Sequence, residues 1–353
     1  MTPSFKSSRL TALAFGVAAA ALLGIVATRP ALAQKTKLVV YTAVESDDLK
    51  KYKDRFERDV KDVEIQWVRD STGVVTAKLL AEKNNAQADI VWGLAATSLM
   101  LLEAEGMLLP YAPKELDKIA PLFRDSKNPP TWVGMDVWAA ALCFNTVEAQ
   151  KKNLAKPASW LDLTKPEYKG TVSMPNPASS GTGYLMISSW LQIMGEDAGW
   201  KFLDGLHANA GTYTHSGSKP CRQAGAGEYP VGLSFEFRAS RTKRDGAPID
   251  IVFPKEGLGW DMEATAIVKG TKNEAAAKKL ADWAASRAAN DLYAEGYAVT
   301  AQVDAAKQLP HLPSPVDFQK LLAKNDFLWA AKNRDRILKQ WETKYGSKSE
   351  PKS

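Results

Sequence analysis

The stretch KLVVYTAVESDDLKKYKDRFERDVKDVEIQWVRDSTG, residues 37–73, decides the fold class. It begins with β-branched and aromatic residues, which are typical of a β-strand. Leu49, Tyr52 and Phe56 then follow at spacings of three and four residues, so the next segment is predicted to be a helix with one apolar face. Residues 63–68, VEIQWV, have a second strand pattern, and the stretch therefore predicts a strand–helix–strand unit.

The same alternation continues beyond this stretch. Residues 74–83 have a helix pattern, residues 88–93 a strand pattern, and residues 95–106 a helix pattern again. Short connections between alternating strands and helices favour a parallel sheet with helices on both faces. The predicted fold class is therefore α/β.

A long apolar run, VGMDVWAAALCFNT at residues 133–146, interrupts this alternation and has no helix pattern. We interpret it as an extended crossover into a second lobe, and residues 263–270, EATAIVKG, as the return strand. The predicted lobes are residues 34–136 with 263–353, and residues 137–262, joined at a hinge with a cleft between them. Ligands of open α/β sheets bind beyond the carboxyl ends of the strands, so the cleft is the predicted site.

Residues 1–33 differ from the rest of the chain. Lys6 and Arg9 precede an apolar run of 18 residues, and Ala31 and Ala33 fit the small-residue rule for signal-peptide cleavage. This pattern predicts an exported protein that is cleaved near Ala33. The alternative is an uncleaved membrane anchor, because the run is long enough to span a bilayer.

The charge of the chain is modest and mixed. Lys and Arg number 46 against 40 Asp and Glu, a net charge of +6. Lys6, Arg9 and Arg29 lie in the predicted signal peptide, so the excess in the remaining chain is only 3. Because no run of basic residues occurs, we expect no nucleic-acid partner.

The chain has two cysteines, Cys143 and Cys221. In an exported protein an even pair is predicted to form a disulfide, because the compartment is oxidising. The alternative is a pair of small buried thiols.

Two short loops combine hydroxyl residues with glycine where helices begin: DSTG at residues 70–73 and SSGTG at residues 179–183. The first turn of a helix has unpaired N–H groups and a partial positive charge. Glycine lets the backbone approach a ligand, and Ser and Thr hydroxyls add donors. The loops therefore predict a site for a tetrahedral anion such as phosphate or phosphonate, with simple N-capping as the alternative.

Carboxylates stand beside aromatic residues elsewhere in the predicted cleft. Glu236 lies between Phe235 and Phe237, and Asp261 and Glu263 follow Trp260. A carboxylate and a ring face together suit an ammonium group, although surface or crossover salt bridges are the alternative for each residue alone. An anion site and an ammonium site together predict a small zwitterionic ligand.

Each predicted ligand residue has a role in this hypothesis. The hydroxyl and glycine residues hold the anion, and aromatic side chains form the cleft wall. Glu236 or Asp261 binds the ammonium group, and Glu45 is a further candidate for this role. The predicted ligand-binding residues are Tyr41, Thr42, Glu45, Ser71, Thr72, Gly73, Trp92, Gly93, Ser179, Ser180, Gly181, Thr182, Glu236, Trp260 and Asp261.

Patterns for catalysis and metal binding are missing. His207, His215 and His311 are scattered without metal-ligand spacing. The sequence has no GxSxG elbow, no GxGxxG after the first strand and no Walker A loop. We therefore expect no metal, no cofactor and no enzymatic activity.

Several segments resemble one family over nearly the whole chain after residue 33. They include YTAVESDDLKKYK, WVRDSTG, ADIVWGLAATS, NPPTWVGMDVWAA, MPNPASSGTG, THSGSKPC, FPKEGLGWDMEATAIVKGTKN and KNDFLWAAKNRDRIL. They are similar to extracytoplasmic solute-binding proteins of ABC importers with the type II periplasmic-binding fold, and in particular to the 2-aminoethylphosphonate-binding subfamily.

The resemblance implies a monomeric periplasmic receptor that delivers 2-aminoethylphosphonate to a permease and an ATPase in the inner membrane. Alternatives within the same fold are a polyamine, a ferric ion or a sugar phosphate as ligand. An exported phosphonate-processing enzyme and a chemoreceptor partner are further alternatives.

Overall fold

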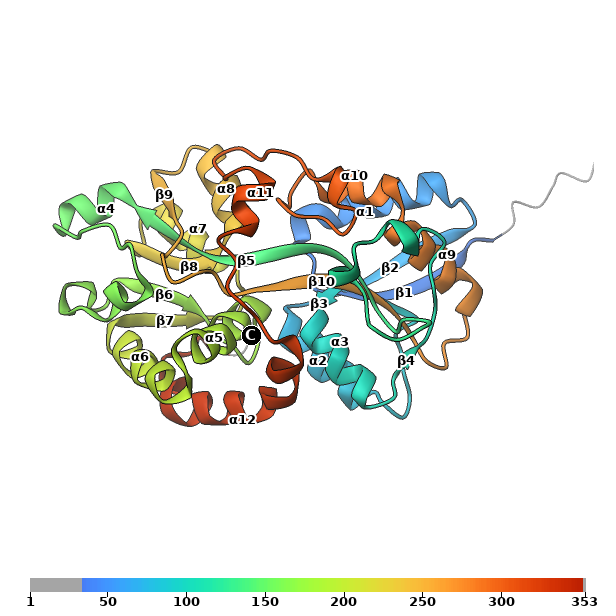
Figure 1. The fold of residues 1–353 in the computed structure, drawn as a ribbon, viewed down its shortest axis with the longest axis horizontal. Helices are drawn as coiled ribbons and strands as arrows, with labels where there is room; N and C mark the ends of the chain where they lie inside the picture. The colour runs from blue at the N-terminus through green and yellow to red at the C-terminus, as the bar shows by residue number, and fades with distance from the viewer. Residues whose placement is uncertain (1–33, 352–353) are drawn as a thin grey trace, which may run out of the picture. The chain divides into compact units, whose positions relative to one another are not determined.

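The computed structural model describes residues 34–351, and the predicted signal peptide lies outside them. These residues form a mixed α/β fold (Figure 1). The strands are β1 Thr36–Thr42, β2 Val63–Arg69, β3 Ile90–Ala95, β4 Leu108–Leu109, β5 Val133–Asn145, β6 Val172–Pro175, β7 Ala210–Thr214, β8 Val231–Phe235, β9 Ile249–Val252 and β10 Trp260–Val268. The α-helices are α1 Ser46–Asp59, α2 Thr72–Ala81, α3 Ala96–Ala104, α4 Thr146–Lys151, α5 Gly181–Met194, α6 Glu196–Asn209, α7 Lys219–Ala226, α8 Glu236–Arg244, α9 Glu274–Ala285, α10 Arg287–Tyr293, α11 Pro315–Gln319 and α12 Phe327–Tyr345.

Helix α1 illustrates how the sequence pattern produces an element. Tyr52 and Phe56 are buried, as their spacing predicts, and the polar residues between them face outward. Asp47 and Asp48 occupy the first turn and Arg58 the last, which suits the partial charges at the two helix ends.

The strands form one sheet in the order β2-β1-β3-β10-β5-β8-β6-β7, with β4 added to β10 and β9 added to β5. Strand β1 is parallel to β2 and β3, but β10 is antiparallel to both β3 and β5. The sheet is therefore mixed rather than parallel as predicted. The reason is that β10 belongs to the returning chain and enters the sheet beside β3 in the opposite direction.

Strand β5 joins two halves of the sheet. Its beginning pairs with β10, whereas its end pairs with β8 and β9. All 13 of its residues are buried. We call β1, β2, β3, β4 and β10 with their helices the first half, and β6, β7, β8 and β9 with their helices the second half. The predicted crossover at residues 133–146 and return strand at residues 263–270 correspond to β5 and β10, and Figure 1 shows β5 running from one half into the other.

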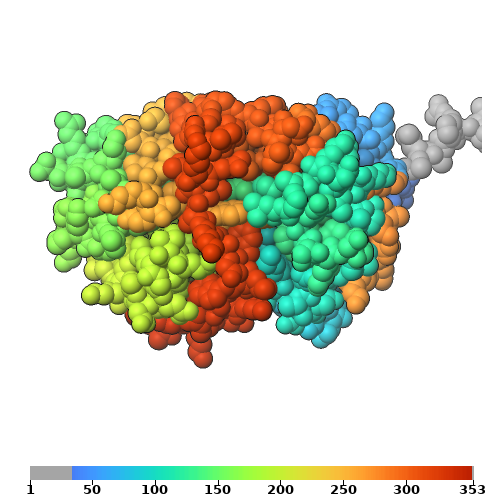
Figure 2. All heavy atoms as spheres, viewed as in Figure 1, coloured from blue at the N-terminus to red at the C-terminus, as the bar shows by residue number. Residues whose placement is uncertain are grey.

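The C-terminal helix α12 contacts elements of both halves. Tyr184 of α5 donates a hydrogen bond to the carbonyl of Ala330, and Trp341 packs edge-on against Tyr213 of β7. The segment before it is bonded to the start of β10, where Asn325 donates to the carbonyl of Trp260. Figure 2 shows this red segment running across the face of the molecule. Helix α12 therefore packs against α3 of the first half as well as against α5 and β7 of the second, and the lobe boundaries stay a prediction.

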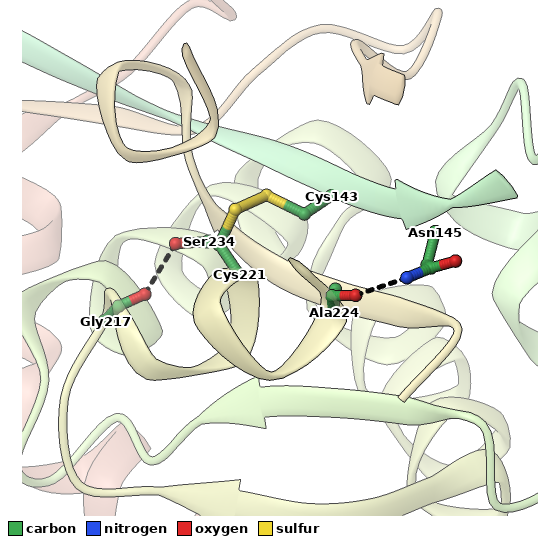
Figure 3. Close-up of a disulfide and its surroundings, with 6 residues drawn as sticks. All are labelled: Cys143, Asn145, Gly217, Cys221, Ala224 and Ser234. Atoms are coloured by element: carbon green, nitrogen blue, oxygen red, sulfur yellow. Dashed lines mark hydrogen bonds between the residues drawn. A yellow bond between two sulfur atoms is a disulfide. The ribbon is translucent and has the colours of Figure 1, made fainter. Parts of the chain in front are cut away.

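A disulfide joins Cys143 of β5 to Cys221 of α7 (Figure 3). The Cα atoms are 5.3 Å apart, and the bridge is fully buried. Two hydrogen bonds flank it: Ser234 Oγ donates to the carbonyl of Gly217 at 2.7 Å, and Asn145 Nδ2 donates to the carbonyl of Ala224 at 2.7 Å. The disulfide therefore holds α7, and the loop before it, against the strands.

No helix within residues 34–351 combines the length and the hydrophobicity that crossing a membrane requires.

Candidate ligand-binding pocket

A pocket with a cavity volume of about 40 Å³ lies where the two halves meet. The first half contributes residues from β2, β3, α2 and the loop after β1. The second contributes residues from α5, β8, α8 and the loop before α7, and β5 and β10 each add one residue. The lining residues are Ala43, Glu45, Arg69, Ser71, Thr72, Gly93, Ala95, Trp138, Ser180, Gly181, Thr182, Ser216, Gly217, Phe235, Phe237 and Glu263.

The N-termini of α2 and α5 meet at this pocket. A methyl group built on Gly181 would lie 2.6 Å from Thr72 Oγ1, and one built on Gly217 would lie 2.4 Å from Thr182 Oγ1. Glycine at positions 181 and 217 is therefore required for this close approach. Two helix starts, one from each half, bring their partial positive charges to one place.

Several donors at these helix starts have no partner within residues 34–351. The first-turn amides of a helix lack intrahelical acceptors. The carbonyl of Ser179 accepts from the amide of Gly73 at 2.8 Å, and Ser180 Oγ accepts from the amide of Gly183 at 3.3 Å. In the described chain this leaves the amides of Gly181 and Thr182 and the hydroxyl groups of Thr72 and Thr182 available at the pocket.

Arg69 adds a positive charge beside α2. Its Nε donates to the carbonyl of Val44 at 3.1 Å, which fixes the side chain at the end of β2. Glu45 lies next to it, with its Oε1 3.8 Å from Arg69 Nη2. Arg238 also binds Glu45 directly, and Arg222 Nη2 is 3.6 Å from the same carboxylate. The charge of Glu45 is thus already shared among three arginines.

Contacts on both sides of the pocket tie the halves together. On one side the amide of Gly73 donates to Ser179, and His215 Nε2 is 3.0 Å from Asp70 Oδ1. On the other side Arg241 of α8 forms a salt bridge with Asp48 of α1. Direct contacts therefore join the first and second halves near the pocket.

Buried carboxyl groups lie at the pocket and beside it. Glu263 lines the pocket, and its Oε2 accepts a hydrogen bond from Tyr297 at 3.0 Å. Glu236 lies behind the wall, where its Oε2 accepts from the amide of Ala139 at 2.8 Å. Asp136 pairs with Glu263 across β5 and β10. Both oxygens of Asp136 and Oε1 of Glu236 are buried without a hydrogen-bond partner.

Burial dominates the titration of these groups, because desolvation penalises the charged form. It raises the pKa of Glu236 to about 8, although the amide of Ala139 opposes the shift. It likewise raises the pKa of Glu263 to about 8, with the Tyr297 hydroxyl opposing and Asp48 and Glu45 adding to the shift. The pKa of Asp136 is raised well above its ordinary value by burial and by the neighbouring carboxyl groups.

Comparison with known proteins identifies the family. A family model described as bacterial extracellular solute-binding protein matches residues 85–323, which is more than half of the chain. The chain belongs to this family.

Individual relatives agree with this assignment. An uncharacterized protein of Haemophilus influenzae is 32% identical over 287 residues, covering 79% of this chain and 82% of the relative. A probable ABC transporter periplasmic-binding protein of Sinorhizobium fredii is 28% identical and covers 62% of each chain. The structure of the periplasmic binding protein AfuA from Actinobacillus pleuropneumoniae, with fructose-6-phosphate bound, has a TM-score of 0.82 and 30% identity, covering 89% of this chain and 100% of that one.

The protein is therefore the periplasmic solute-binding component of an ABC importer, with a type II periplasmic-binding fold. Members of the family are transport binding proteins that hold a small solute and work with permease and ATPase components.

The structure brings one group of the predicted site residues of this solute-binding protein together. Both helix-start loops contribute, as does the end of β3. The predicted residues that line the pocket are Glu45, Ser71, Thr72, Gly93, Ser180, Gly181 and Thr182.

The predicted aromatic wall is corrected by the structure. Tyr41 donates its hydroxyl hydrogen to Glu82 outside the pocket. Trp92 is fully buried among aromatic side chains and donates to Tyr293 at 2.9 Å. Trp260 donates to the carbonyl of Ala323 at 2.8 Å. These side chains point away from the pocket, because successive side chains of a strand point to opposite faces of the sheet.

Five other predicted residues lie close to the pocket without lining it. Thr42 Oγ1 accepts from the amide of Val44, and Gly73 and Ser179 bond to each other through their backbones. Glu236 lies behind the wall. Asp261 accepts from Thr97 Oγ1 at 2.6 Å, and burial raises its pKa to about 6. Their hydrogen bonds are made within the protein, and none of the five lines the pocket.

Sequence reasoning left other lining residues unassigned. Arg69 directly precedes the DSTG loop, and a positive charge next to such a loop indicates that Arg69 could bind the anion. Glu263 is one of the carboxylates that the sequence places beside aromatic residues, but it is not among the predicted ligand-binding residues. Trp138 gave no signal, because every residue of β5 is buried and apolar alternation is absent. The unassigned lining residues are Ala43, Arg69, Ala95, Trp138, Ser216, Gly217, Phe235, Phe237 and Glu263.

We expect Glu236→Gln to flatten the pH dependence of stability. Because the folded-state pKa of Glu236 is about 8, above its ordinary 4.5, the folded protein retains a proton that the unfolded chain loses. The Glu236 carboxyl group therefore lowers the free energy of unfolding as pH rises from about 4.5 to about 8. Outside this range it does not change the dependence of that free energy on pH. The variant should gain stability relative to the natural protein across this window, by an amount on the order of a few kcal/mol.

Urea unfolding followed by circular dichroism at several pH values measures this difference. Glu105→Gln on the exposed surface is the matched control and should leave the pH profile unchanged. A stability difference between Glu236→Gln and the natural protein that stays constant with pH would contradict the expectation.

Proposed function

We propose that this solute-binding protein binds 2-aminoethylphosphonate in the pocket between the two halves and delivers it to the permease. The single observation that carries the proposal is the convergence of two helix N-termini, one from each half, on a pocket that is also lined by Glu263 and by aromatic side chains.

We place the phosphonate group of the ligand at the N-termini of α2 and α5. Transferring a phosphonate from water is costly unless each oxygen is hydrogen-bonded. The amides of Gly181 and Thr182 and the hydroxyl groups of Thr72 and Thr182 supply donors, and Arg69 supplies a full positive charge. Helix N-termini and arginine are suited to such oxygens. Ser71 and Ser180 line the same end of the pocket.

We place the ammonium group of the ligand beside Glu263. Glu263 presents a carboxyl group there, and Trp138, Phe235 and Phe237 present aromatic surface. An ammonium group is attracted both to a carboxylate and to an aromatic ring face. Glu45 is the other acidic residue of the lining, but its arginine partners already balance its charge.

The alternative ligands fit this pocket less well. A polyamine or a ferric ion would place positive charge against Arg69 and two helix N-termini, which repel it. A sugar phosphate, as in the AfuA structure, suits the anion end. Its hydroxyl groups, however, would face the apolar side chains of Trp138, Phe235 and Phe237 and lose hydrogen bonds there. A zwitterion without hydroxyl groups matches both ends.

Isothermal titration calorimetry of the protein without residues 1–33 tests the proposal. The ligands to compare are 2-aminoethylphosphonate, inorganic phosphate, ethanolamine, fructose-6-phosphate and spermidine. We expect 2-aminoethylphosphonate to bind tightest, because it alone satisfies both ends of the pocket. Tighter binding of fructose-6-phosphate or spermidine would overturn the ligand assignment while leaving the family assignment intact.

A further inference from the structure

Glu263 differs from the other acidic side chain of the pocket, Glu45, in its partners. Glu45 contacts Arg238 and lies near Arg222 and Arg69. Within residues 34–351, Glu263 has no basic side chain within salt-bridge distance, and its bonded partner is the hydroxyl group of Tyr297. It is buried and nevertheless faces the pocket. Its capacity to bind a cation is therefore unused.

The groups behind Glu263 strengthen this contrast. Asp136 is its cross-strand neighbour, and neither of its oxygens has a hydrogen-bond partner in the described chain. Glu236 also has an unpartnered buried oxygen, Oε1. Leaving carboxyl oxygens buried without donors is costly. A positive group arriving at Glu263 would relieve this cost for the whole cluster.

We propose that Glu263 is the subsite for the ligand's ammonium group, backed by Asp136 and Glu236, and that it releases its proton to solvent when the ammonium group binds. The inference rests on the proposed function, because it assigns the cationic end of the same zwitterionic ligand. The exchange is balanced: the protonated carboxyl group loses H⁺ to water, and the resulting carboxylate pairs with the ammonium group.

The surroundings of Glu263 determine the direction of the pH effect. Burial, with Asp48 of α1 and Glu45 adding negative potential, raises the pKa of Glu263 to about 8, whereas the Tyr297 hydroxyl and Arg69 act in the opposite direction. Asp136 of β5 also faces it.

Glu236 of α8, Tyr52 of α1 and Tyr293 of α10 complete the titratable groups around the cluster. Near neutral pH Glu263 therefore holds a proton before the ligand arrives. A cation favours the ionised form, so binding releases a proton and affinity rises with pH until about pH 8.

Calorimetry near neutral pH, in two buffers with different ionisation enthalpies, measures the proton release. The natural protein and Glu263→Gln are each titrated with 2-aminoethylphosphonate and with ethylphosphonate, which has the same head group without the amine. The proton change of 2-aminoethylphosphonate itself appears with both the natural protein and Glu263→Gln, so the difference between these two proteins isolates the proton of Glu263. Asp261→Asn is the matched control, since Asp261 is a buried carboxyl group on the same strand that does not line the pocket.

On binding 2-aminoethylphosphonate, the natural protein should release up to one proton more than Glu263→Gln does. Glu263→Gln should lose that extra release and bind 2-aminoethylphosphonate about ten- to a hundredfold more weakly, as expected for a lost charge-assisted bond. It should still bind ethylphosphonate, which shows that the pocket remains folded. Asp261→Asn should retain both the affinity and the release.

The remaining outcomes separate the two proposals. Glu263→Gln with unchanged affinity and proton release, or with equal loss for both ligands, would overturn the subsite and leave a phosphonate receptor. The same conclusion follows if the natural protein binds both phosphonates equally. If it binds neither, the proposed function fails, and the subsite fails with it.

Discussion

The double variant Thr72→Val/Thr182→Val is expected to bind 2-aminoethylphosphonate at least about a hundredfold more weakly than the natural protein. Both hydroxyl groups face the pocket, and within residues 34–351 neither is engaged in a hydrogen bond. Valine keeps the shape of threonine and removes only the donor. A hydrogen bond to a charged group contributes about 1.5–3 kcal/mol, and two such bonds are lost.

Calorimetric titration measures this loss, and thermal unfolding without ligand shows whether the fold is intact. Thr343→Val on the exposed side of α12 is a matched control that should bind normally. Ser180 is a less suitable target, because its hydroxyl also caps α5. A double variant with the natural affinity would rule out the helix-start site for the anion.

Removing the disulfide is expected to give the largest loss of stability. Cys143 and Cys221 are 78 positions apart, so the bridge restricts a long loop of the unfolded chain. Replacing both with alanine should lower the free energy of unfolding by about 2–5 kcal/mol, which denaturant unfolding measures. Because Gly217 precedes α7, ligand affinity should also fall to a smaller extent.

The control for this experiment is the reductant itself. The natural protein should unfold at lower denaturant concentration after reduction, whereas the alanine variant should not respond. Equal unfolding midpoints for oxidised and reduced natural protein would contradict a stabilising bridge.

Much of the fold follows from local patterns in the sequence. The apolar spacing of α1 and the β-branched runs of β1 and β2 predict those elements, because helix and strand periods differ. The direction of β10 in the sheet cannot be predicted from such local patterns. Its residues read as a strand, but its pairing with β3 is set by where the returning chain enters the sheet, more than 160 positions later. Local propensity carries no information on such pairing.

The pocket was predictable to a similar degree. The DSTG and SSGTG loops carry their own signal, and the structure brings Thr72 against Gly181. Trp92 shows the limit of reasoning from strand ends, since its side chain enters the aromatic core while the adjacent Gly93 lines the pocket. Trp138 lies in a strand that is buried on both faces, so no alternation marks the side that meets the ligand.

A crystal structure of the protein with 2-aminoethylphosphonate is the most direct measurement of the central claim. We expect the phosphonate oxygens within hydrogen-bond distance of the amides of Gly181 and Thr182 and the hydroxyl group of Thr72, with the amine directed to Glu263. A ligand bound outside this pocket, or one whose phosphonate lies at Glu263 and whose amine lies at the helix starts, would contradict it.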